Sequence, residues 1–163
     1  MNYLSISKED MCNGEGSRVV LWVSGCEHHC EKCRSKFSWD SDTGSKFTDI
    51  EIESILSELN KDYITGITFS GGDPLHPNNI TTITSLSKMI KNKYTNKSIW
   101  CYTGHSYEDV KNYELMKYLD VLVDGKYVDT LSSPSPKWCG STNQRLIDVK
   151  QSLEKDKVVL YNI

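Results

Sequence analysis

The stretch Cys26-Glu27-His28-His29-Cys30-Glu31-Lys32-Cys33 carries three thiols within eight residues. It follows the apolar run Val19-Val20-Leu21-Trp22-Val23, whose β-branched and aromatic composition and short length predict a buried strand. Gly25 lies at the junction, where a residue without a side chain allows the backbone to turn sharply. Thiolates on a loop at the end of a strand are the soft ligands that zinc and iron–sulfur clusters require. The stretch therefore predicts a metal site.

The number of cysteines leaves three interpretations open. A structural zinc site uses four protein ligands, and His28 or His29 would complete such a set. A four-iron cluster normally has four thiolates, so a cluster held by three leaves one iron open to another ligand. The three thiols could also be unrelated buried side chains. These eight residues alone do not decide among the three.

The composition is that of a small globular protein. The chain has 163 residues, of which 25% are charged and 37% apolar, with a net charge of −3, which predicts one domain over residues 1–163. Its mild acidity argues against nucleic acid as a partner, and no apolar run approaches the ~20 residues of a membrane span. The first ten residues lack a signal-peptide pattern, so we expect a cytoplasmic protein with reduced cysteines.

Strand-like and helix-like segments alternate in the rest of the chain. The segments with strand composition cover residues 64–69, 98–102 and 121–123, and helical patterns separate them. This alternation predicts a parallel sheet with right-handed crossovers. Small or polar residues follow each strand, and ligands of open α/β sheets bind outside these carboxyl ends.

The helix starts and the chain ends carry further predictions. Thr48 and Glu51 have the spacing of a capping box, and Asn78 or Asn79 is suited to cap the next helix. Residues 1–11 are expected to form a polar lead-in. The last expected strands cover residues 146–149 and 158–161.

The motif Ser70-Gly71-Gly72-Asp73-Pro74 follows the strand-like segment 64–69. Two glycines at the end of a strand let a ligand approach the backbone closely. Pro74 restricts Asp73 to an extended conformation. A plain strand-to-helix turn is the alternative when this motif is considered alone.

Together these motifs resemble the radical S-adenosylmethionine enzymes, and more closely the family of activating proteins of anaerobic ribonucleoside-triphosphate reductases. The resemblance extends in family order from about residue 12 to 150 and favours iron over zinc. The matching segments are Asn13-Gly14-Glu15-Gly16-Ser17-Arg18-Val19-Val20-Leu21, Val23-Ser24-Gly25-Cys26, Gly66-Ile67-Thr68-Phe69-Ser70-Gly71-Gly72-Asp73-Pro74-Leu75, Tyr102-Thr103-Gly104, Asp120-Val121-Leu122-Val123-Asp124-Gly125-Lys126 and Gly140-Ser141-Thr142-Asn143-Gln144-Arg145.

The resemblance implies a fold and a set of ligands. The implied fold is a single α/β domain, a partial β/α barrel of the radical S-adenosylmethionine type with a mostly parallel sheet. A 4Fe–4S cluster is implied on Cys26, Cys30 and Cys33, with the fourth iron chelated by the amino and carboxylate groups of S-adenosylmethionine. Asp124 and Lys126 match an Asp-x-Lys motif that contacts the methionine end of the cofactor in a related enzyme. The residues implied in cofactor binding are Lys32, Cys33, Arg34, Gly71, Gly72, Asp73, Asp124 and Lys126.

The implied activity is the activation of an anaerobic ribonucleoside-triphosphate reductase. Reductive cleavage of S-adenosylmethionine at the cluster would give a 5′-deoxyadenosyl radical, which would take a hydrogen from a glycine of the reductase and leave a glycyl radical. The implied partners are the reductase and an electron donor such as flavodoxin. The alternatives are another radical S-adenosylmethionine enzyme, acting on a different glycyl-radical protein or a small molecule, and a non-catalytic zinc-binding module.

Further expectations concern individual residues. The resemblance implies that the backbone of Gly71-Gly72-Asp73 contacts the amino group of the methionine part of S-adenosylmethionine. Arg34-Ser35 stands where relatives often have Tyr-Asn, and Cys139 stands where they often have arginine. Cys12, Cys101 and Cys139 are expected to be ordinary free thiols. The four histidines are expected to be loop, surface or packing residues rather than ligands.

Overall fold

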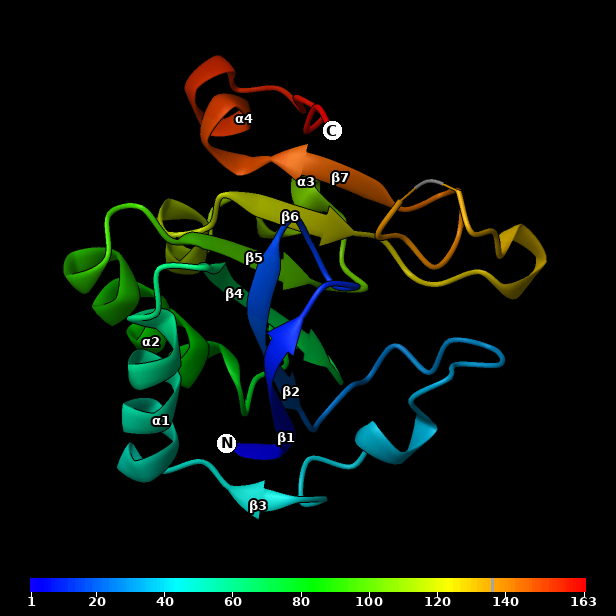
Figure 1. Ribbon diagram of the computed structural model, residues 1–163. Helices are drawn as coiled ribbons and strands as arrows, with labels where there is room; N and C mark the ends of the chain where they lie inside the picture. The colour runs from blue at the N-terminus through cyan, green and yellow to red at the C-terminus, as the bar shows by residue number, and fades with distance from the viewer. Residues whose placement is uncertain (136) are drawn as a thin grey trace.

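The computed structural model describes residues 1–135 and 137–163. In these ranges the chain forms one seven-stranded sheet with the order β3-β1-β2-β4-β5-β6-β7 (Figure 1). The strands are β1 (Asn2–Asp10), β2 (Ser17–Val23), β3 (Ser45–Lys46), β4 (Ile64–Gly71), β5 (Ser98–Tyr102), β6 (Val121–Asp124) and β7 (Arg145–Asp148). The helices are α1 (Asp49–Leu59), α2 (Ile80–Lys93), α3 (Tyr107–Val110) and α4 (Val149–Lys155), with short 3-10 helices η1 (Lys36–Ser38), η2 (Glu114–Lys117) and η3 (Asp129–Leu131). None of these helices is both long and apolar enough to cross a membrane.

Parallel pairing is confined to the centre of the sheet. β2, β4, β5 and β6 are parallel neighbours, whereas β1 pairs antiparallel with β2 and β3, and β6 pairs antiparallel with β7. The α/β class is confirmed, but the expectation of a mostly parallel sheet is wrong for the sheet as a whole. β1 returns into β2 through residues 11–16, which are too few for the crossover that a parallel pair needs.

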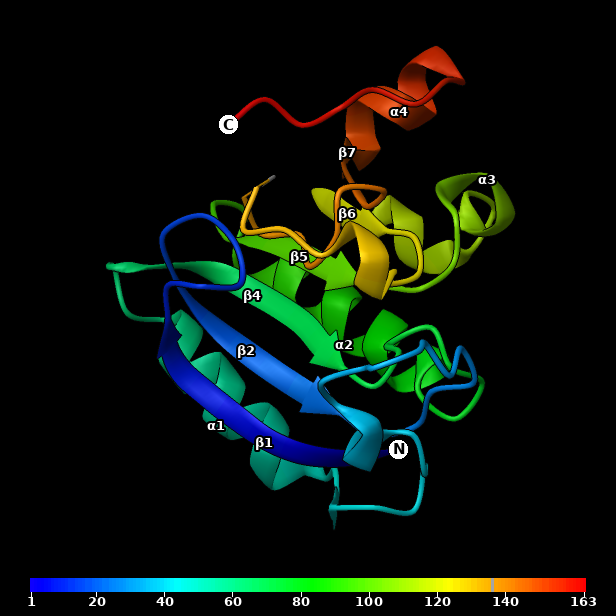
Figure 2. The same cartoon turned by 90° about the vertical axis from the view of Figure 1, so that its right-hand side faces the viewer.

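The two faces of the sheet bury separate apolar clusters. One face packs against α1 and α2, which Figure 2 shows on the same side of the sheet. Leu21, Phe69 and Ile99 are buried there together with Ile55 and Ile83 from the two helices. Successive residues of a strand point to opposite faces, so strand residues that alternate with members of the first cluster, such as Trp100 beside Ile99, form a second cluster on the other face. That cluster contains Trp100, Val121, Val123 and Leu146, with Trp138 and Tyr161 packed against it.

The two ends of the chain differ from the expected elements. Residues 2–10 form β1 rather than a polar lead-in. None of the residues of β1 is fully buried, so polar side chains are tolerated along it and conceal the strand in the sequence. Residues 158–161 do not form a strand, since Leu160 makes only an isolated bridge to Ile147. The last helix, α4, begins at Val149, inside the expected strand 146–149.

Both helix starts lie near their expected residues. Thr48 caps α1 with its hydroxyl, and the carboxylate of Glu51 accepts a hydrogen bond of 2.7 Å from the Thr48 amide, which completes the capping box. Asn79 occupies the N-cap position of α2, but its side chain makes no capping bond. Its side-chain amide instead donates to the carbonyls of Ser24 and Asp73, so it joins the end of β2 to the turn after β4.

We predict that Thr48→Ala lowers the free energy of unfolding by about 1 kcal/mol, the usual cost of losing an N-cap side chain. Thr48→Ser keeps the hydroxyl and should retain most of the stability of the wild type. Urea unfolding followed by circular dichroism measures both variants. An equal loss in the two would contradict the capping role of the hydroxyl.

Candidate metal and cofactor site

The carboxyl ends of β2, β4, β5 and β6 lie at one edge of the sheet, around a pocket of about 150 Å³. In Figure 1 the loops after β2 and β6 extend from this edge on the right of the view. We call residues 24–35 the cysteine loop. The pocket is lined by that loop, by the turn after β4, and by residues that follow β5 and β6. This is the edge at which the sequence predicts a ligand.

All three cysteines of the cysteine loop contribute to the pocket wall. Cys26, Cys30 and Cys33 are free, half-buried thiols that line the same cavity. Cys101 is buried in the core and Cys12 is exposed, and neither lines this pocket. The structure therefore brings together the three thiols that the sequence predicts as ligands, and it separates them from these two other cysteines.

The start of the cysteine loop is fixed by backbone hydrogen bonds. The amide of Gly25 donates to the carbonyl of Ser38 at 2.7 Å, and the amide of Cys26 donates to the carbonyl of Trp39 at 3.0 Å. Burial raises the pKa of the Cys26 thiol to about 11, although the backbone amide of His28, which faces the sulfur, opposes this shift. The Cys26 thiol is therefore protonated at neutral pH, and a metal that binds its thiolate must displace the proton.

The middle of the cysteine loop contains two backbone bends. His29 has φ +47° and Lys32 has φ +53°, in the left-handed region that residues other than glycine adopt in only a few per cent of cases. Between the two later cysteines, the amide of Cys33 donates to the carbonyl of Cys30 at 3.1 Å. The bends turn the loop back on itself, so that cysteines four and three residues apart reach one pocket.

Gly71, the last residue of β4, and Gly72 are required by the close approach of the protein's own backbone. Gly71 has φ +107°, and a Cβ there would lie 2.6 Å from the carbonyl oxygen of Val23. A Cβ on Gly72 would lie 2.5 Å from the carbonyl oxygen of Gly25. The amides of Gly72 and Asp73 donate to these same two carbonyls, each at 2.7 Å. These amides are therefore committed to β2 and the cysteine loop, and a bound amino group here would be held by carbonyl oxygens.

The carboxylate of Asp73 lies under the pocket and is almost completely buried, at 2% exposure. Its Oδ1 accepts a hydrogen bond from the amide of Leu75 at 2.8 Å. Its Oδ2 accepts from the hydroxyl of Thr103 at 2.9 Å and from the amide of Gly104 at 3.1 Å, and it lies 2.5 Å from Nε2 of His28. Burial alone would raise the pKa of Asp73, but these hydrogen bonds hold it below its ordinary value.

The histidines of the cysteine loop do not offer an obvious fourth ligand. Nε2 of His28 faces the carboxylate of Asp73, and Nδ1 of His29 lies 3.0 Å from the carbonyl oxygen of Glu27. Each imidazole is thus engaged with the protein through one of its nitrogens. This arrangement does not favour the zinc interpretation, in which one of the two rings would turn toward the three thiols.

Two of the predicted cofactor residues lie outside the pocket lining. The Lys32 ammonium is exposed and pairs with the carboxylate of Asp129 at 2.8 Å. Arg34 lines a small adjoining cavity with Cys33 and Tyr127. These two cations therefore lie at the outer rim, on the side of the cysteine loop that faces the chain after β6.

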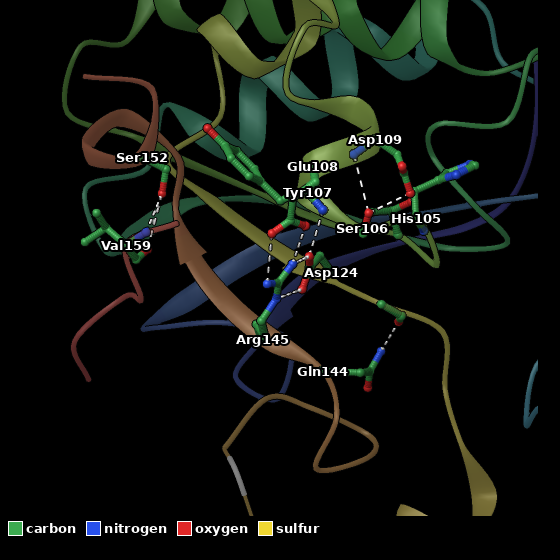
Figure 3. Close-up of polar contacts among 12 residues, drawn as sticks. His105, Ser106, Tyr107, Glu108, Asp109, Asp124, Gln144, Arg145, Ser152 and Val159 are labelled. Carbon is green, nitrogen blue, oxygen red and sulfur yellow. Dashed lines mark hydrogen bonds and ion pairs between the residues drawn. The ribbon is translucent and has the colours of Figure 1, made fainter. Parts of the chain in front are cut away.

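Asp124 and Lys126 also contribute no side chain to the pocket lining. Figure 3 shows the carboxylate of Asp124 turned toward the guanidinium of Arg145, with Oδ1 3.0 Å from Nε, and it also accepts a hydrogen bond from the amide of Tyr107 at 2.8 Å. The same guanidinium pairs with Glu108 at 2.8 Å. Asp124 is 1% exposed, so it joins β6, β7 and the start of α3 below the pocket, and Lys126 is exposed.

Some pocket residues were not predicted as site residues. Gln144 lines the pocket, and Figure 3 shows its side-chain amide directed toward the chain after β6, where it donates to the carbonyl of Gly125 at 2.9 Å. Its Oε1 accepts hydrogen bonds from the amides of Gly140 and Ser141. The segment 140–145 matches the family pattern, and that match is the signal that could have identified Gln144.

Trp39 also lines the pocket, and nothing in the sequence singled it out. Its Nε1 is buried and has no hydrogen-bond partner among the described residues. An unpaired buried donor is costly, so it needs a partner supplied by water or a ligand. Three free thiols in the wall of one pocket fit a metal–sulfur group that needs thiolate ligands.

Comparison with known proteins supports the same assignment. A family model described as a 4Fe-4S single cluster domain matches residues 12–147. Three similar proteins are each named anaerobic ribonucleoside-triphosphate reductase-activating protein. The one from enterobacteria phage T4 is 46% identical over 147 residues, which cover 90% of this chain and 93% of that protein. Those from Haemophilus influenzae and Escherichia coli K12 are 39% and 40% identical over 148 residues, which cover 88% of this chain and 96% of each relative. With this identity over nearly the whole of both chains, the chain belongs to the family of anaerobic ribonucleoside-triphosphate reductase-activating proteins.

Proposed function

We propose that this protein activates an anaerobic, class III ribonucleoside-triphosphate reductase by forming a glycyl radical on it. The observation that carries the proposal is the gathering of Cys26, Cys30 and Cys33 in one pocket at the carboxyl ends of the parallel strands. Family membership supports the same reaction and partner. In this proposal residues 1–163 act as a single radical S-adenosylmethionine domain with a partial β/α barrel, and a donor such as flavodoxin supplies the electron.

The proposed cofactors are a 4Fe–4S cluster on Cys26, Cys30 and Cys33, and S-adenosylmethionine chelated to the fourth iron. When bound, they supply the reductive cleavage that yields a 5′-deoxyadenosyl radical able to take hydrogen from a glycine of the reductase. The contribution of the chain is to bind, orient and shield these groups. Backbone carbonyls of Gly71-Gly72-Asp73 are proposed to accept hydrogen bonds from the methionine amino group, since an amino group donates and the amides of Gly72 and Asp73 already donate to Val23 and Gly25.

The support for the other proposed cofactor-binding residues differs from one residue to the next. Cys33, Gly71, Gly72 and Asp73 line the pocket, which supports a role for each of them there. Lys32 and Arg34 are proposed to act at the rim of the pocket. Asp124 and Lys126 are proposed to act through Gly125, which lies between them in the sequence and belongs to the pocket wall. A role for the Asp124 carboxylate in orienting this backbone is supported by its burial and by its bonds to Arg145 and Tyr107.

We predict that Cys26→Ala, Cys30→Ala and Cys33→Ala each fail to retain a four-iron cluster. The matched controls Cys12→Ala and Cys139→Ala should retain it, because these thiols do not line the pocket. Iron and sulfide analysis after anaerobic reconstitution, with EPR of the reduced proteins, measures the difference. A full cluster in any of the first three variants would contradict the proposed ligand set.

The activity is tested by mixing the reduced, reconstituted protein with S-adenosylmethionine and the cognate anaerobic reductase. We expect the EPR doublet of a glycyl radical, and we expect none when the Cys30→Ala protein replaces the wild type. Cofactor cleavage without a glycyl radical on a competent reductase would reject this partner and favour a different radical enzyme. Zinc in place of iron in the anaerobically purified protein would reject the reaction itself.

Asp124→Asn separates support of the fold from direct contact with the cofactor. We predict a loss of roughly 1–3 kcal/mol in the free energy of unfolding, because the buried ionic hydrogen bonds to Arg145 are weakened. The folded variant should still bind S-adenosylmethionine, since the carboxylate does not line the pocket. Urea unfolding and the cofactor-induced change in the EPR spectrum measure the two effects. A folded variant that no longer binds the cofactor would show that the carboxylate contributes to binding beyond its support of the fold.

A further inference from the structure

The imidazole of His28 connects the cysteine loop to the sheet. His28 lies in the three-residue spacer between Cys26 and Cys30, yet its side chain is only 10% exposed. Its Nε2 lies 2.5 Å from Oδ2 of Asp73, and its ring meets that of His105 edge-on, with 4.5 Å between the ring centroids. A loop histidine in an ordinary surface role would not be held on two sides in this way.

The acceptor for this imidazole is itself held in place. The Asp73 carboxylate accepts hydrogen bonds from Leu75, on its own turn, and from Thr103 and Gly104 after β5. The carboxylate is therefore oriented by two strand ends independently of the cysteine loop. The three nearby potential metal-binding groups of His28, Asp73 and His105 lie within 4.8 Å of one another. Because Oδ2 already has three hydrogen-bond partners, this arrangement is a hydrogen-bonded anchor rather than an ion site.

The chain also leaves room for the ring. A Cβ on Gly104 would lie 2.4 Å from Cδ2 of His28 and 2.7 Å from its Nε2. Any residue other than glycine at this position would push the ring away from the carboxylate. The glycine after β5 is therefore matched to a side chain that comes from the loop after β2, 76 positions earlier in the sequence (104 minus 28).

The backbone of the same residue lies beside a thiol. The amide of His28 opposes the rise that burial causes in the pKa of Cys26. Hydrogen bonding and solvent exposure around the sulfurs set the potential of an iron–sulfur centre. His28 is thus fixed to the sheet by its side chain while its backbone lies next to a proposed ligand.

We infer that His28 is a positioning residue: its bond to Asp73 holds the spacer between Cys26 and Cys30 so that both thiols stand ready for the cluster. The inference rests on the proposed function, because it assumes a cluster on Cys26. It adds a role for a histidine that is not itself a ligand. It also assigns the Asp73 carboxylate a role of its own, anchoring His28, beside the proposed contact of the Asp73 backbone with the cofactor.

The first test compares His28→Ala with His28→Gln after anaerobic reconstitution. The alanine variant should lose iron to a chelator roughly ten- to a hundredfold faster than the wild type, the usual effect of removing a group that orients a metal ligand. Its cluster potential should shift, because release of the spacer changes the backbone and the solvent exposure around the Cys26 sulfur. Glutamine can still donate to Asp73 and should restore much of both properties. His29→Asn, which removes the neighbouring imidazole and tolerates the left-handed backbone, is the control and should resemble the wild type.

Gly104→Ala provides an independent test, because it displaces the imidazole while keeping both partners. It should reproduce the faster iron loss and the shift in potential. The double variant His28→Ala/Gly104→Ala should be no worse than His28→Ala alone, since both changes act on the same contact. Additive effects in the double variant would show that the two substitutions act through different contacts, which would contradict the inference. Thermal unfolding of the metal-free proteins records any general loss of stability.

The outcomes distinguish the inference from the proposed function. A wild type that assembles no 4Fe–4S cluster would overturn the proposed function, and this inference with it. A wild type that assembles the cluster while His28→Ala matches it in chelator resistance and potential would overturn the inference alone. If His28→Ala does not fold, Gly104→Ala decides, and a cluster like that of the wild type in this variant would overturn the inference.

Discussion

The carboxylate of Asp73 joins three segments that are distant in the sequence. It accepts hydrogen bonds from its own turn, from the residues that follow β5, and from a histidine of the cysteine loop. A buried charge is tolerated only when its lone pairs are satisfied, and here the donors come from all three segments. The loss of any one segment would leave a charged group underbonded, so the arrangement of the pocket floor is cooperative.

Close packing of the backbone at the same edge of the sheet also holds the pocket together. Gly71 and Gly72 allow the end of β4 to lie directly against Val23 and Gly25, with two short amide-to-carbonyl hydrogen bonds. Asn79 adds a further link between the end of β2 and the turn after β4. The cysteine loop is thus tied to the sheet at its start by backbone and in its middle by His28. A loop held at both points can present three thiols to one cavity without help from regular secondary structure.

The sequence predicts the parts of this architecture that depend on local pattern. The strands before the cysteine loop and the Gly-Gly-Asp-Pro turn follow from apolar runs ended by small residues, and the Thr48 capping box follows from spacing. β1 escapes prediction because its partly exposed residues tolerate polar side chains. The contact between His28 and Asp73 escapes because the partners are 45 positions apart and no periodicity relates them. Asp124 was assigned by its motif, while the partner that engages its carboxylate, Arg145, becomes visible only when β6 and β7 pair.

The central claim is that three thiolates hold a cluster whose remaining iron binds a small sulfonium molecule. Electron–nuclear double resonance of the reduced protein tests it most directly, with S-adenosylmethionine labelled with 15N in its amino group and 17O in its carboxylate. The account predicts hyperfine coupling from the cluster to both labels. Coupling to neither label, in a sample where the cofactor is bound and the cluster intact, would contradict it.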